Sequence, residues 1–262
     1  MRGTEPHNKK KSRKSGSKRR AKSGWRQYLT IGLAVLLAAL LVAGVWYVER
    51  RSHHPEVSVA KAEYPIQGID VSNHNGVIDF EKVAAAGINF VYVKASEGVG
   101  YKDPRFENNI RNARKAGLKV GAYHFFRKDK DGTSQAEYFM QVVKDVAVDM
   151  PYVIDVEDWG NSVLASDGET VKNLRDMVRH LETSNLKLMV YTNKDGYRKY
   201  LKLYFPEVRL WLCAFTHPSK LTDFDWHIHQ YSHWGSVDGI DGEVDLDVFK
   251  GNCEEWERWL ME

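Results

Sequence analysis

The stretch MPYVIDVEDWG, residues 150–160, is an apolar run that ends on three carboxylates, a tryptophan and a glycine. Because residues 152–156 are rich in β-branched side chains and lie between Pro and Gly, they predict a buried strand. Side chains alternate along a strand, so Asp155 and Glu157 point to one side and Val156 to the other. Two carboxyls on one face beside an aromatic residue suit cleavage of a glycosidic bond. That reaction needs one acid to protonate the leaving oxygen and a second negative charge to stabilise a cationic sugar.

Two other interpretations of these residues are open. An Asp or Glu just past a strand often caps the next helix, and Asp158 suits that role. Paired carboxylates also bind divalent cations. The rest of the chain decides between these interpretations.

The charge of the chain is distributed unevenly. Residues 1–27 hold 11 of the 38 Lys and Arg residues and one of the 35 acidic residues, Glu5. The remaining chain therefore has 27 basic and 34 acidic residues, a net charge of −7. A tail rich in Gly, Ser and Lys without apolar periodicity is predicted to be disordered. Such a tail could bind nucleic acid, but the segment that follows it favours anionic lipid as the partner, and we expect no nucleic-acid partner.

Residues 28–48 are almost wholly apolar and uncharged, and 21 residues are enough for a helix to cross a bilayer. The aromatic residues Trp25, Tyr28, Trp46 and Tyr47 lie near its two ends, where interfacial aromatics occur. The positive-inside rule then predicts a single-pass signal anchor in the cell membrane. Residues 1–27 would be its cytoplasmic tail, and the body would lie on the periplasmic or extracellular side.

A cleaved signal peptide is the alternative to an anchor. It would have an apolar region of about 7–15 residues and an A-x-A-like cleavage site. The apolar run here is longer, and only residues 42–44 faintly resemble such a site. An uncleaved transmembrane helix is therefore favoured.

Residues 49–65 are polar and aperiodic, which predicts a linker, and strands alternate with helices from residue 66 onward. The pattern predicts strands at 66–71, 88–95, 118–126, 152–156, 187–192, 208–215, 226–231 and 244–249, and helices at 80–86, 104–116, 134–146, 171–183, 196–203 and 254–260. Gly87 and Gly117 follow two of these helices and suit their left-handed caps. Five strand–helix units followed by three strands predict an α/β fold, an irregular (β/α)5(β)3 TIM-like barrel over residues 66–262.

The two cysteines leave the redox state open. Cys213 lies in a predicted strand and Cys253 at the start of the last predicted helix. Outside the cytoplasm they could form a disulfide, but the apolar neighbours of Cys213 equally favour two packed thiols. The chain has no Cys/His zinc pattern, so we expect neither a metal nor another cofactor.

Acidic and aromatic residues follow the predicted strands. In a parallel barrel, functional groups gather where the strands end at the carboxyl face. The predicted strand ends carry Asp70, Glu97, Tyr123, His124, Asp155, Glu157, Tyr191, Asn193, Trp211, Gln230, Tyr231, Asp245 and Asp247. Carboxylates for chemistry and aromatic faces for pyranose rings suit a sugar polymer as substrate, although each aromatic residue taken alone would suit the core equally well.

Blocks along the body resemble glycoside hydrolase family 25. The blocks are GIDVS (68–72), FVYVKASEG (90–98), GAYHF (121–125), IDVE (154–157), YTN (191–193), LW (210–211), HQY (229–231) and VDLD (244–247). They stand in the order of the family and together cover nearly the whole body. The resemblance implies a barrel of five β/α units and three strands. It also implies a lysozyme (N-acetylmuramidase) that cuts the β-1,4 bond between N-acetylmuramic acid and N-acetylglucosamine in peptidoglycan.

The resemblance further implies roles for single residues. Glu157 is expected to be the general acid and Asp155 its partner carboxylate, with Asp70 and Asp245 as supporting acids. Asp247 stands where the family often has Asn and is expected to be structural. The residues expected to bind substrate are Tyr123, Trp159, Tyr191, Trp211, Gln230 and Glu97. For an acid role, the pKa of Glu157 must be raised toward neutrality by burial and by Asp155.

Two points of mechanism and two rival functions are open. Asp155 could attack the sugar itself or assist the N-acetyl group of the substrate, a known exception to the two-carboxylate scheme, and we favour the second. Both routes retain the anomeric configuration. A catalytically inactive peptidoglycan-binding module on the same fold is one rival, and a metal-dependent hydrolase such as a deacetylase is the other. We expect a membrane-anchored monomer that acts on peptidoglycan glycan strands.

Overall fold

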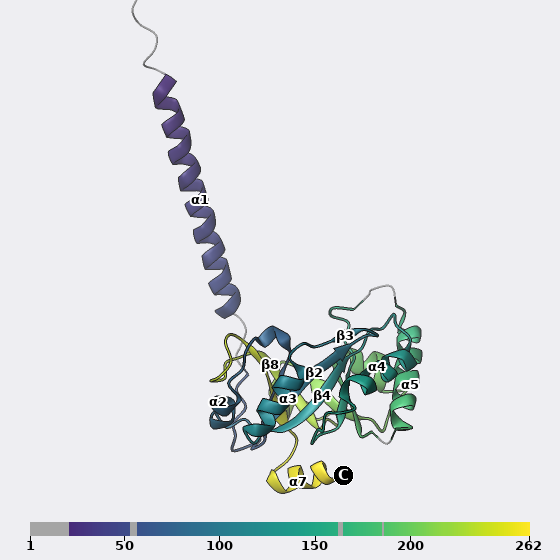
Figure 1. Ribbon diagram of the computed structural model, residues 1–262. Helices are drawn as coiled ribbons and strands as arrows, with labels where there is room; N and C mark the ends of the chain where they lie inside the picture. Colours follow the sequence, from purple (N-terminus) through teal and green to yellow (C-terminus); the bar gives the residue numbers. More distant parts are fainter. Residues whose placement is uncertain (1–20, 53–56, 162–164, 185) are drawn as a thin grey trace, which may run out of the picture. The chain divides into compact units, whose positions relative to one another are not determined.

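The computed structural model describes residues 21–52, 57–161, 165–184 and 186–262 of the chain (Figure 1). The chain forms two compact units, which divide after Pro55. Most of the predicted basic tail, and residues 53–56 of the predicted linker, lie outside the described residues.

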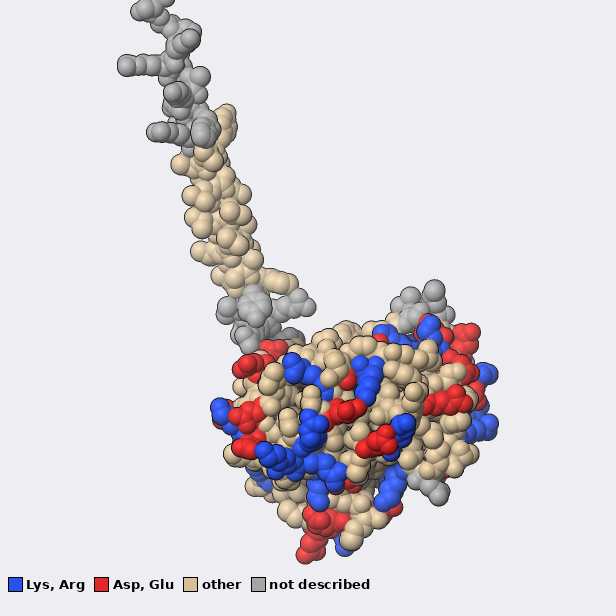
Figure 2. Space-filling view, viewed as in Figure 1, with Lys and Arg blue, Asp and Glu red and all other residues tan. Residues whose placement is uncertain are grey.

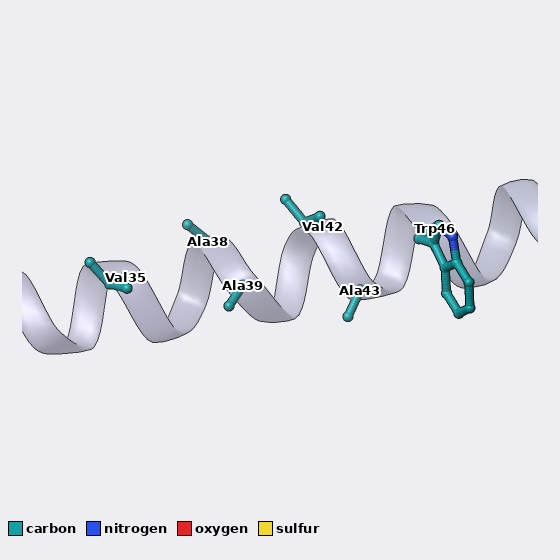
Figure 3. A pocket seen from close by; sticks show the side chains of 6 residues that line it. All are labelled: Val35, Ala38, Ala39, Val42, Ala43 and Trp46. Atoms are coloured by element: carbon teal, nitrogen blue, oxygen red, sulfur yellow. The ribbon is translucent and has the colours of Figure 1, made fainter.

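The first unit contains one long helix, α1 (Ala21–Ser52). Its segment Tyr28–Trp46 is long and apolar enough to cross a membrane by length and composition. Every large apolar side chain of that segment is more than half exposed, and Figure 2 shows no charged side chain along it. The side chains of Val35, Ala38, Ala39, Val42, Ala43 and Trp46 project from this helix in Figure 3. Such a surface is unfavourable in water and favourable in hydrocarbon, so the helix agrees with the predicted anchor, whose insertion in a membrane stays a prediction.

Within the described residues of the second unit, eight strands close into a barrel. They are β1 (Gln67–Val71), β2 (Phe90–Glu97), β4 (Lys119–Phe125), β5 (Tyr152–Asp155), β6 (Leu188–Asn193), β7 (Arg209–Cys213), β8 (Ile228–Gly235) and β9 (Val244–Phe249). Strand β1 pairs with both β2 and β9, which closes the ring. Neighbouring strands are parallel except that β9 runs antiparallel to β8 and β1. The predicted (β/α)5(β)3 barrel is confirmed.

Helices cover the outside of the barrel between its first strands. They are α2 (Phe80–Ala85), α3 (Phe106–Lys115), α4 (Gly132–Val143) and α5 (Asp167–Glu182), followed by the short α6 (Lys194–Gly196) with a π-helical turn over Tyr197–Leu201. Two of them begin earlier than predicted because polar residues cap their first turns. Asp131 accepts a hydrogen bond from the backbone of Ser134 at α4, and Ser166 forms a capping box with Glu169 at α5.

Alternation along the strands separates two cores. In β2, Phe90 and Tyr92 point into the barrel, whereas Val91 and Val93 pack outward against the helices. The inner core is mostly aromatic and the outer one mostly aliphatic. This is the period-two pattern of a strand that is buried on both faces.

The last helix, α7 (Cys253–Met261), belongs to the inner core. It buries Trp256 and Trp259, which stack at 5.3 Å between ring centroids. Trp256 also lies 5.4 Å from the ring of Phe90 and 5.0 Å from that of Phe249. The helix thus covers the end of the barrel where β2 begins and β9 ends, opposite the carboxyl ends of the parallel strands.

We expect Trp256→Ala to lower the free energy of unfolding of residues 56–262 by about 3–5 kcal/mol, because it removes a large buried ring and leaves a cavity. Urea unfolding followed by circular dichroism measures this change. Met261→Ala on the same helix is the control, since Met261 is 75% exposed and its loss should change stability by less than about 0.5 kcal/mol. A loss below about 1 kcal/mol for Trp256→Ala would contradict the role of α7 in the core.

One strand was not predicted. Strand β3 (Tyr101–Lys102) pairs antiparallel with Ser96 and Glu97, outside the closed ring. Two residues are too few to show a period in sequence. The hairpin nevertheless matters because it folds over the carboxyl end of β2, beside the candidate site.

Candidate active site

Four acidic side chains from three places in the sequence meet at the carboxyl ends of the parallel strands. Asp70 is the next-to-last residue of β1 and Asp155 the last residue of β5, and Glu157 follows Asp155 by two residues. Asp245 belongs to β9, whose direction is reversed, so the beginning of β9 lies at the same edge. The register pairs Asp245 directly with Asp70. The structure therefore brings together all four residues predicted to be catalytic.

The loop after β5 fixes the backbone of the acid pair. Asp155 is 7% exposed, and its Oδ1 has no hydrogen-bond partner within the described part of the chain. The side-chain amide of Asn161 donates to the carbonyl oxygens of Phe126 at 2.9 Å and Glu157 at 3.0 Å. Asn161 thus ties the turn that carries Glu157 to the end of β4.

Burial sets the proton affinities of the pair. Burial raises the pKa of Glu157 to about 7, against the opposing charge of Lys94. Burial, and then the charge of Glu157, raise the pKa of Asp155 well above its ordinary value. Two carboxyls whose charges act on one another hold one proton between them more readily than they hold two negative charges. The pair can therefore offer a proton and a negative charge near neutral pH.

Asp70 is held by a short chain of hydrogen bonds. The amide of Gln230 donates to Asp70 Oδ2 at 2.8 Å, and the hydroxyl of Tyr191 donates to Gln230 Oε1 at 2.9 Å. Burial, and then the neighbouring Asp247, raise the pKa of Asp70. Tyr191 is paired in register with Asp155, so this chain runs from Asp70 across the barrel end to the strand beside β5.

Trp211 has a different place from the one predicted. It is 2% exposed and packs on Tyr92 inside the barrel, at 4.7 Å between ring centroids. Its Nε1 donates to Asp247 Oδ1 at 2.8 Å. Trp211 thus lies beneath the acids and cannot offer a ring face at the surface. Asp247 is fully buried under Asp245, which supports the structural role expected for it. Burial, and then Asp70, raise the pKa of Asp245 to about 9.

Glu97 was predicted to bind substrate, but its carboxylate is occupied by two cations. Oε2 accepts a hydrogen bond from Lys94 Nζ at 2.7 Å, and Oε1 accepts one from Arg127 Nε at 2.9 Å. Partial burial acts to raise the pKa of Glu97, but these two partners outweigh it and lower the pKa. Glu97 therefore lies at the edge of the site as part of an ion-pair network.

Two predicted aromatic ligands remain available at the edge of the site. Tyr123 is partly buried, and its pKa is raised by burial and then by Asp70 and Asp155. Trp159 is 80% exposed in the loop after β5. An exposed indole that close to the acids is well placed to stack on a sugar ring.

Asp158 does not cap a helix. Its carboxylate accepts hydrogen bonds from Lys128 at 2.7 Å, Lys199 at 2.9 Å and the Tyr200 hydroxyl at 2.7 Å. Burial alone would raise the pKa of Asp158, but these donors lower it. The N-cap of α5 is instead Ser166. Asp158 is thus ionised and anchors the loop that carries Glu157.

Three other residues at the predicted strand ends serve the fold. His124 is fully buried between Ser96 and Gln135, and burial lowers its pKa to about 4. Asn193 caps α6, and the hydroxyl of Tyr231 reaches Gln67. The side-chain hydrogen bonds of His124 and Asn193 go to residues other than the acid pair.

The two cysteines are free thiols, which settles the question left open by the sequence. Cys213 is partly buried at the end of β7, and Cys253 is exposed at the start of α7. Burial raises the pKa of Cys213 to about 12, so this thiol stays protonated beside the carboxyls.

Sequence reasoning missed Lys94, Arg127 and Asn161. One feature of the sequence could have pointed to Lys94, which is a charged residue inside the otherwise apolar run of β2. The other two lie in loops without a motif. Arg127 lies 30 residues from Glu97 and Asn161 lies 35 residues from Phe126, so the closed barrel is needed to bring these partners together.

A buried pair of carboxyls at the carboxyl end of such a barrel suits a glycoside hydrolase, and comparison with known proteins assigns the chain to a family of these enzymes. The family model "Glycosyl hydrolases family 25" matches residues 69–240. The chain belongs to this family. It is 34% identical over 185 residues to an autolytic lysozyme of Clostridium acetobutylicum, covering 70% of this chain and 56% of that protein. It is 33% identical over 205 residues to a lysozyme of Streptomyces globisporus, covering 72% and 69%.

The fold has close structural relatives. A family 25 glycosyl hydrolase from Bacillus anthracis superposes with a TM-score of 0.71 at 33% identity, covering 79% of this chain and 98% of that one. A bacterial lysozyme from Streptomyces coelicolor gives a TM-score of 0.64 at 30% identity, covering 74% and 96%. The barrel is therefore the part of the chain that these proteins share.

Proposed function

We propose that this protein is a membrane-anchored lysozyme of family 25, an N-acetylmuramidase that cuts the β-1,4 bond between N-acetylmuramic acid and N-acetylglucosamine in peptidoglycan. The observation that carries the proposal is the buried pair Asp155 and Glu157, with the pKa of Glu157 at about 7. Membership of the family and the names of the lysozyme relatives support the substrate. The whole protein's partners, including its expected monomeric state, stay predictions.

Glu157 is the general acid of the proposed reaction. A carboxyl with a pKa near 7 is protonated below neutrality and still acidic enough to give its proton to a leaving glycosidic oxygen. Asp155 supplies the second charge. In our proposal it orients the N-acetyl group of the substrate, whose oxygen attacks the anomeric carbon, and stabilises the charge that develops there. The configuration is retained because two displacements occur at that carbon.

Asp70 and Asp245 support the pair from the neighbouring strands. Asp70 is fixed by Gln230, and Tyr191 fixes Gln230 in turn. Trp159 and Tyr123 are the proposed contacts for sugar rings. Trp211 acts beneath the site by holding Asp247.

The proposed organisation follows the sequence. Residues 1–27 form a cytoplasmic tail, residues 28–48 a transmembrane anchor and residues 49–65 a linker, and residues 66–262 form the catalytic barrel outside the membrane. The exposed apolar helix supports the anchor.

We expect the full chain to stay with membranes after a wash at high salt. Salt screens the attraction between the basic tail and lipid but leaves an apolar helix in place. Fractionation and immunoblotting of a cell lysate measure this retention. A variant with the basic residues of the tail changed to Gln is the control and should be retained as well. Release of a soluble fragment that begins near Val45 would show cleavage of a signal peptide instead.

Turnover of purified cell walls by residues 56–262 tests the enzyme against its rivals. The enzyme should release soluble glycan fragments, and a silent binding module would sediment with the wall without releasing any. A metal-dependent hydrolase would lose activity with a chelator. The presence of all four acids in one cluster argues against the silent module.

A further inference from the structure

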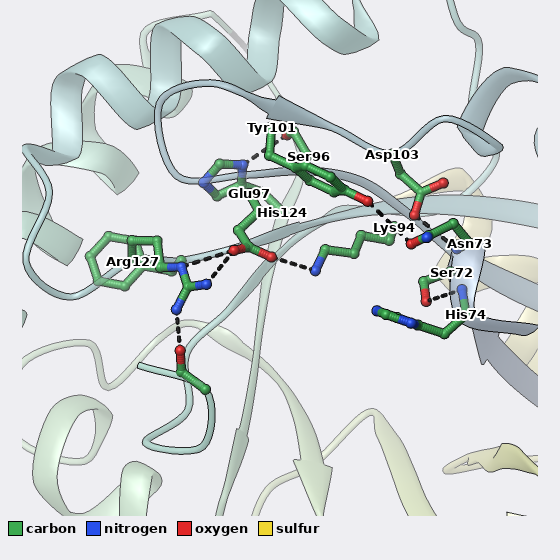
Figure 4. A network of polar contacts seen from close by, with 12 residues as sticks. Ser72, Asn73, His74, Lys94, Ser96, Glu97, Tyr101, Asp103, His124 and Arg127 are labelled. Carbon is green, nitrogen blue, oxygen red and sulfur yellow. Dashed lines mark hydrogen bonds and ion pairs between the residues drawn. The ribbon is translucent and has the colours of Figure 1, made fainter. Parts of the chain in front are cut away.

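Glu97 divides its two carboxylate oxygens between two cations on opposite sides. Oε2 binds Lys94 at 2.7 Å and Oε1 binds Arg127 (Figure 4). The side chains are largely shielded, with 11% exposure for Lys94, 21% for Glu97 and 31% for Arg127. Ion pairs shielded to this degree hold their geometry better than pairs on an open surface.

Lys94 extends from Glu97 toward the acid pair. Its Nζ lies 4.8 Å from the ring centroid of Phe125, and Phe125 is paired in register with Asp155. The positive charge of Lys94 opposes the rise in pKa of both Asp155 and Glu157. The protonation of the catalytic pair therefore depends on where Lys94 is held.

Arg127 extends from Glu97 to the loop after β5. Its guanidinium donates to the carbonyl oxygen of Gly160 and lies 5.1 Å from the ring centroid of Phe125. Gly160 has a φ of +71°, a conformation that glycine adopts without strain, and it directly follows the exposed Trp159. Arg127 therefore fixes the turn that presents the indole.

We propose that Glu97 is a positioning residue that holds two cations for two separate tasks, Lys94 beside the catalytic carboxyls and Arg127 under the turn that presents Trp159 to the glycan strand. This inference rests on the proposed function. It replaces the direct contact with substrate that the sequence suggested for Glu97.

Several other groups influence the acid pair, and none of them takes the place of Lys94. Besides Lys94, the charged groups that act on the two carboxyls of the pair are Asp70, Asp158 and Asp245. The titratable and charged groups next to these residues and to Lys94 are Glu97, Tyr101, Asp103, Tyr123, His124, Arg127, Tyr191, Cys213 and Asp247. Apart from Arg127, which faces the Trp159 turn, this set consists of acids, phenols, a thiol and a buried neutral histidine.

Changing Lys94 should alter the pH profile. Without its positive charge the pKa values of Asp155 and Glu157 rise. The plot of kcat against pH has an acid limb and an alkaline limb. In Lys94→Met both limbs should therefore move to higher pH, by about 1 unit. The substrate is a soluble peptidoglycan glycan strand of defined length, and the enzyme is the full chain in detergent.

Changing Arg127 should alter binding instead. With the turn loosened, Arg127→Met should raise KM about 3–10-fold while leaving both limbs of the kcat profile in place. Glu97→Gln should combine an increase in KM with a shift of the limbs to lower pH, because the charge of Lys94 is then unbalanced beside the acids. Glu97→Asp, which keeps the charge, should recover part of both effects.

Lys102→Met is the matched control and should change neither KM nor the limbs of the kcat profile. Lys102 lies on the neighbouring hairpin and forms an exposed ion pair with Glu107 of α3. Thermal unfolding identifies variants that fail to fold, and for these the conservative Lys94→Arg and Arg127→Lys are measured instead. Lys94→Arg should then keep the wild-type limbs, and Arg127→Lys should show the raised KM in weaker form, because lysine cannot reproduce the planar guanidinium contact.

The inference is overturned if Lys94→Met leaves both limbs unmoved, or if Lys94→Met and Arg127→Met give the same pattern. If Glu157→Gln retains activity, the proposed function itself fails whatever these variants show.

Discussion

Glu157→Gln should lower kcat on purified peptidoglycan by about 10²–10⁴-fold or more, with little change in the binding of the wall. Glutamine has nearly the same shape as glutamic acid but cannot give a proton to the leaving oxygen. The loss should appear in kcat because the proton moves in the transition state. Release of reducing ends measures the rate, and cosedimentation with cell walls measures binding.

The pKa of Glu157 also predicts how kcat changes with pH. Because the pKa of Glu157 is about 7, its acid form prevails below that pH and is lost above it. The wild-type kcat should therefore fall as pH rises through about 7, and the residual rate of Glu157→Gln should show no such limb. Glu107→Gln is the matched control, because Glu107 lies on the exposed first turn of α3. Near wild-type digestion by Glu157→Gln would exclude Glu157 as the acid.

Asp155→Asn should lower kcat by about 10²–10³-fold, because it removes the preorganised charge that stabilises the sugar cation or its N-acetyl adduct. Binding of the wall should persist. The apparent pKa of Glu157 should fall, since one of two coupled negative charges is gone, so the alkaline limb of the remaining activity should move to lower pH. Initial rates across a pH series measure both effects.

Trapping of an intermediate tests whether Asp155 attacks the sugar itself or assists the N-acetyl group of the substrate. If the N-acetyl group of the substrate attacks, a thiazoline analogue of the sugar should inhibit, and no sugar should be found on the protein. A glycosyl adduct on Asp155 after reaction with a slow fluorosugar, detected by intact mass, would favour direct attack by the carboxylate. Product with inverted configuration by NMR would contradict both routes. Asp145→Asn, at an exposed site beyond α4, serves as the control for the charge change.

The barrel could be predicted from sequence because each of its signals is local. Apolar runs of four to eight residues alternate with amphipathic helices, and glycines such as Gly87 and Gly117 end two of those helices at positive φ. The acid pair could be predicted for the same reason, since Asp155 and Glu157 are separated by one residue of a strand. The helix boundaries differ from the predicted ones because caps such as Ser166 lie ahead of the periodic segment.

The site could be predicted only in part, because contacts between distant strands decide it. From its sequence Trp211 suits either the interior or the surface, and in the structure it lies in the middle of β7, paired in register with Tyr191 and Ile228, and points inward. Glu97 looks like a ligand until the pairing of β2 with β4 brings Arg127 to it. The sequence shows which residue types are present, but the pairing of strands in the closed barrel determines which of them are in contact.

The sugar at the reducing end of the digest tests the central claim most directly. Purified peptidoglycan is digested with residues 56–262, the fragments are reduced with borohydride, and mass spectrometry identifies the reduced sugar. The account predicts reduced N-acetylmuramic acid at the end of every new fragment and none above background with Glu157→Gln. Reduced N-acetylglucosamine, or free stem peptides without new reducing ends, would contradict it.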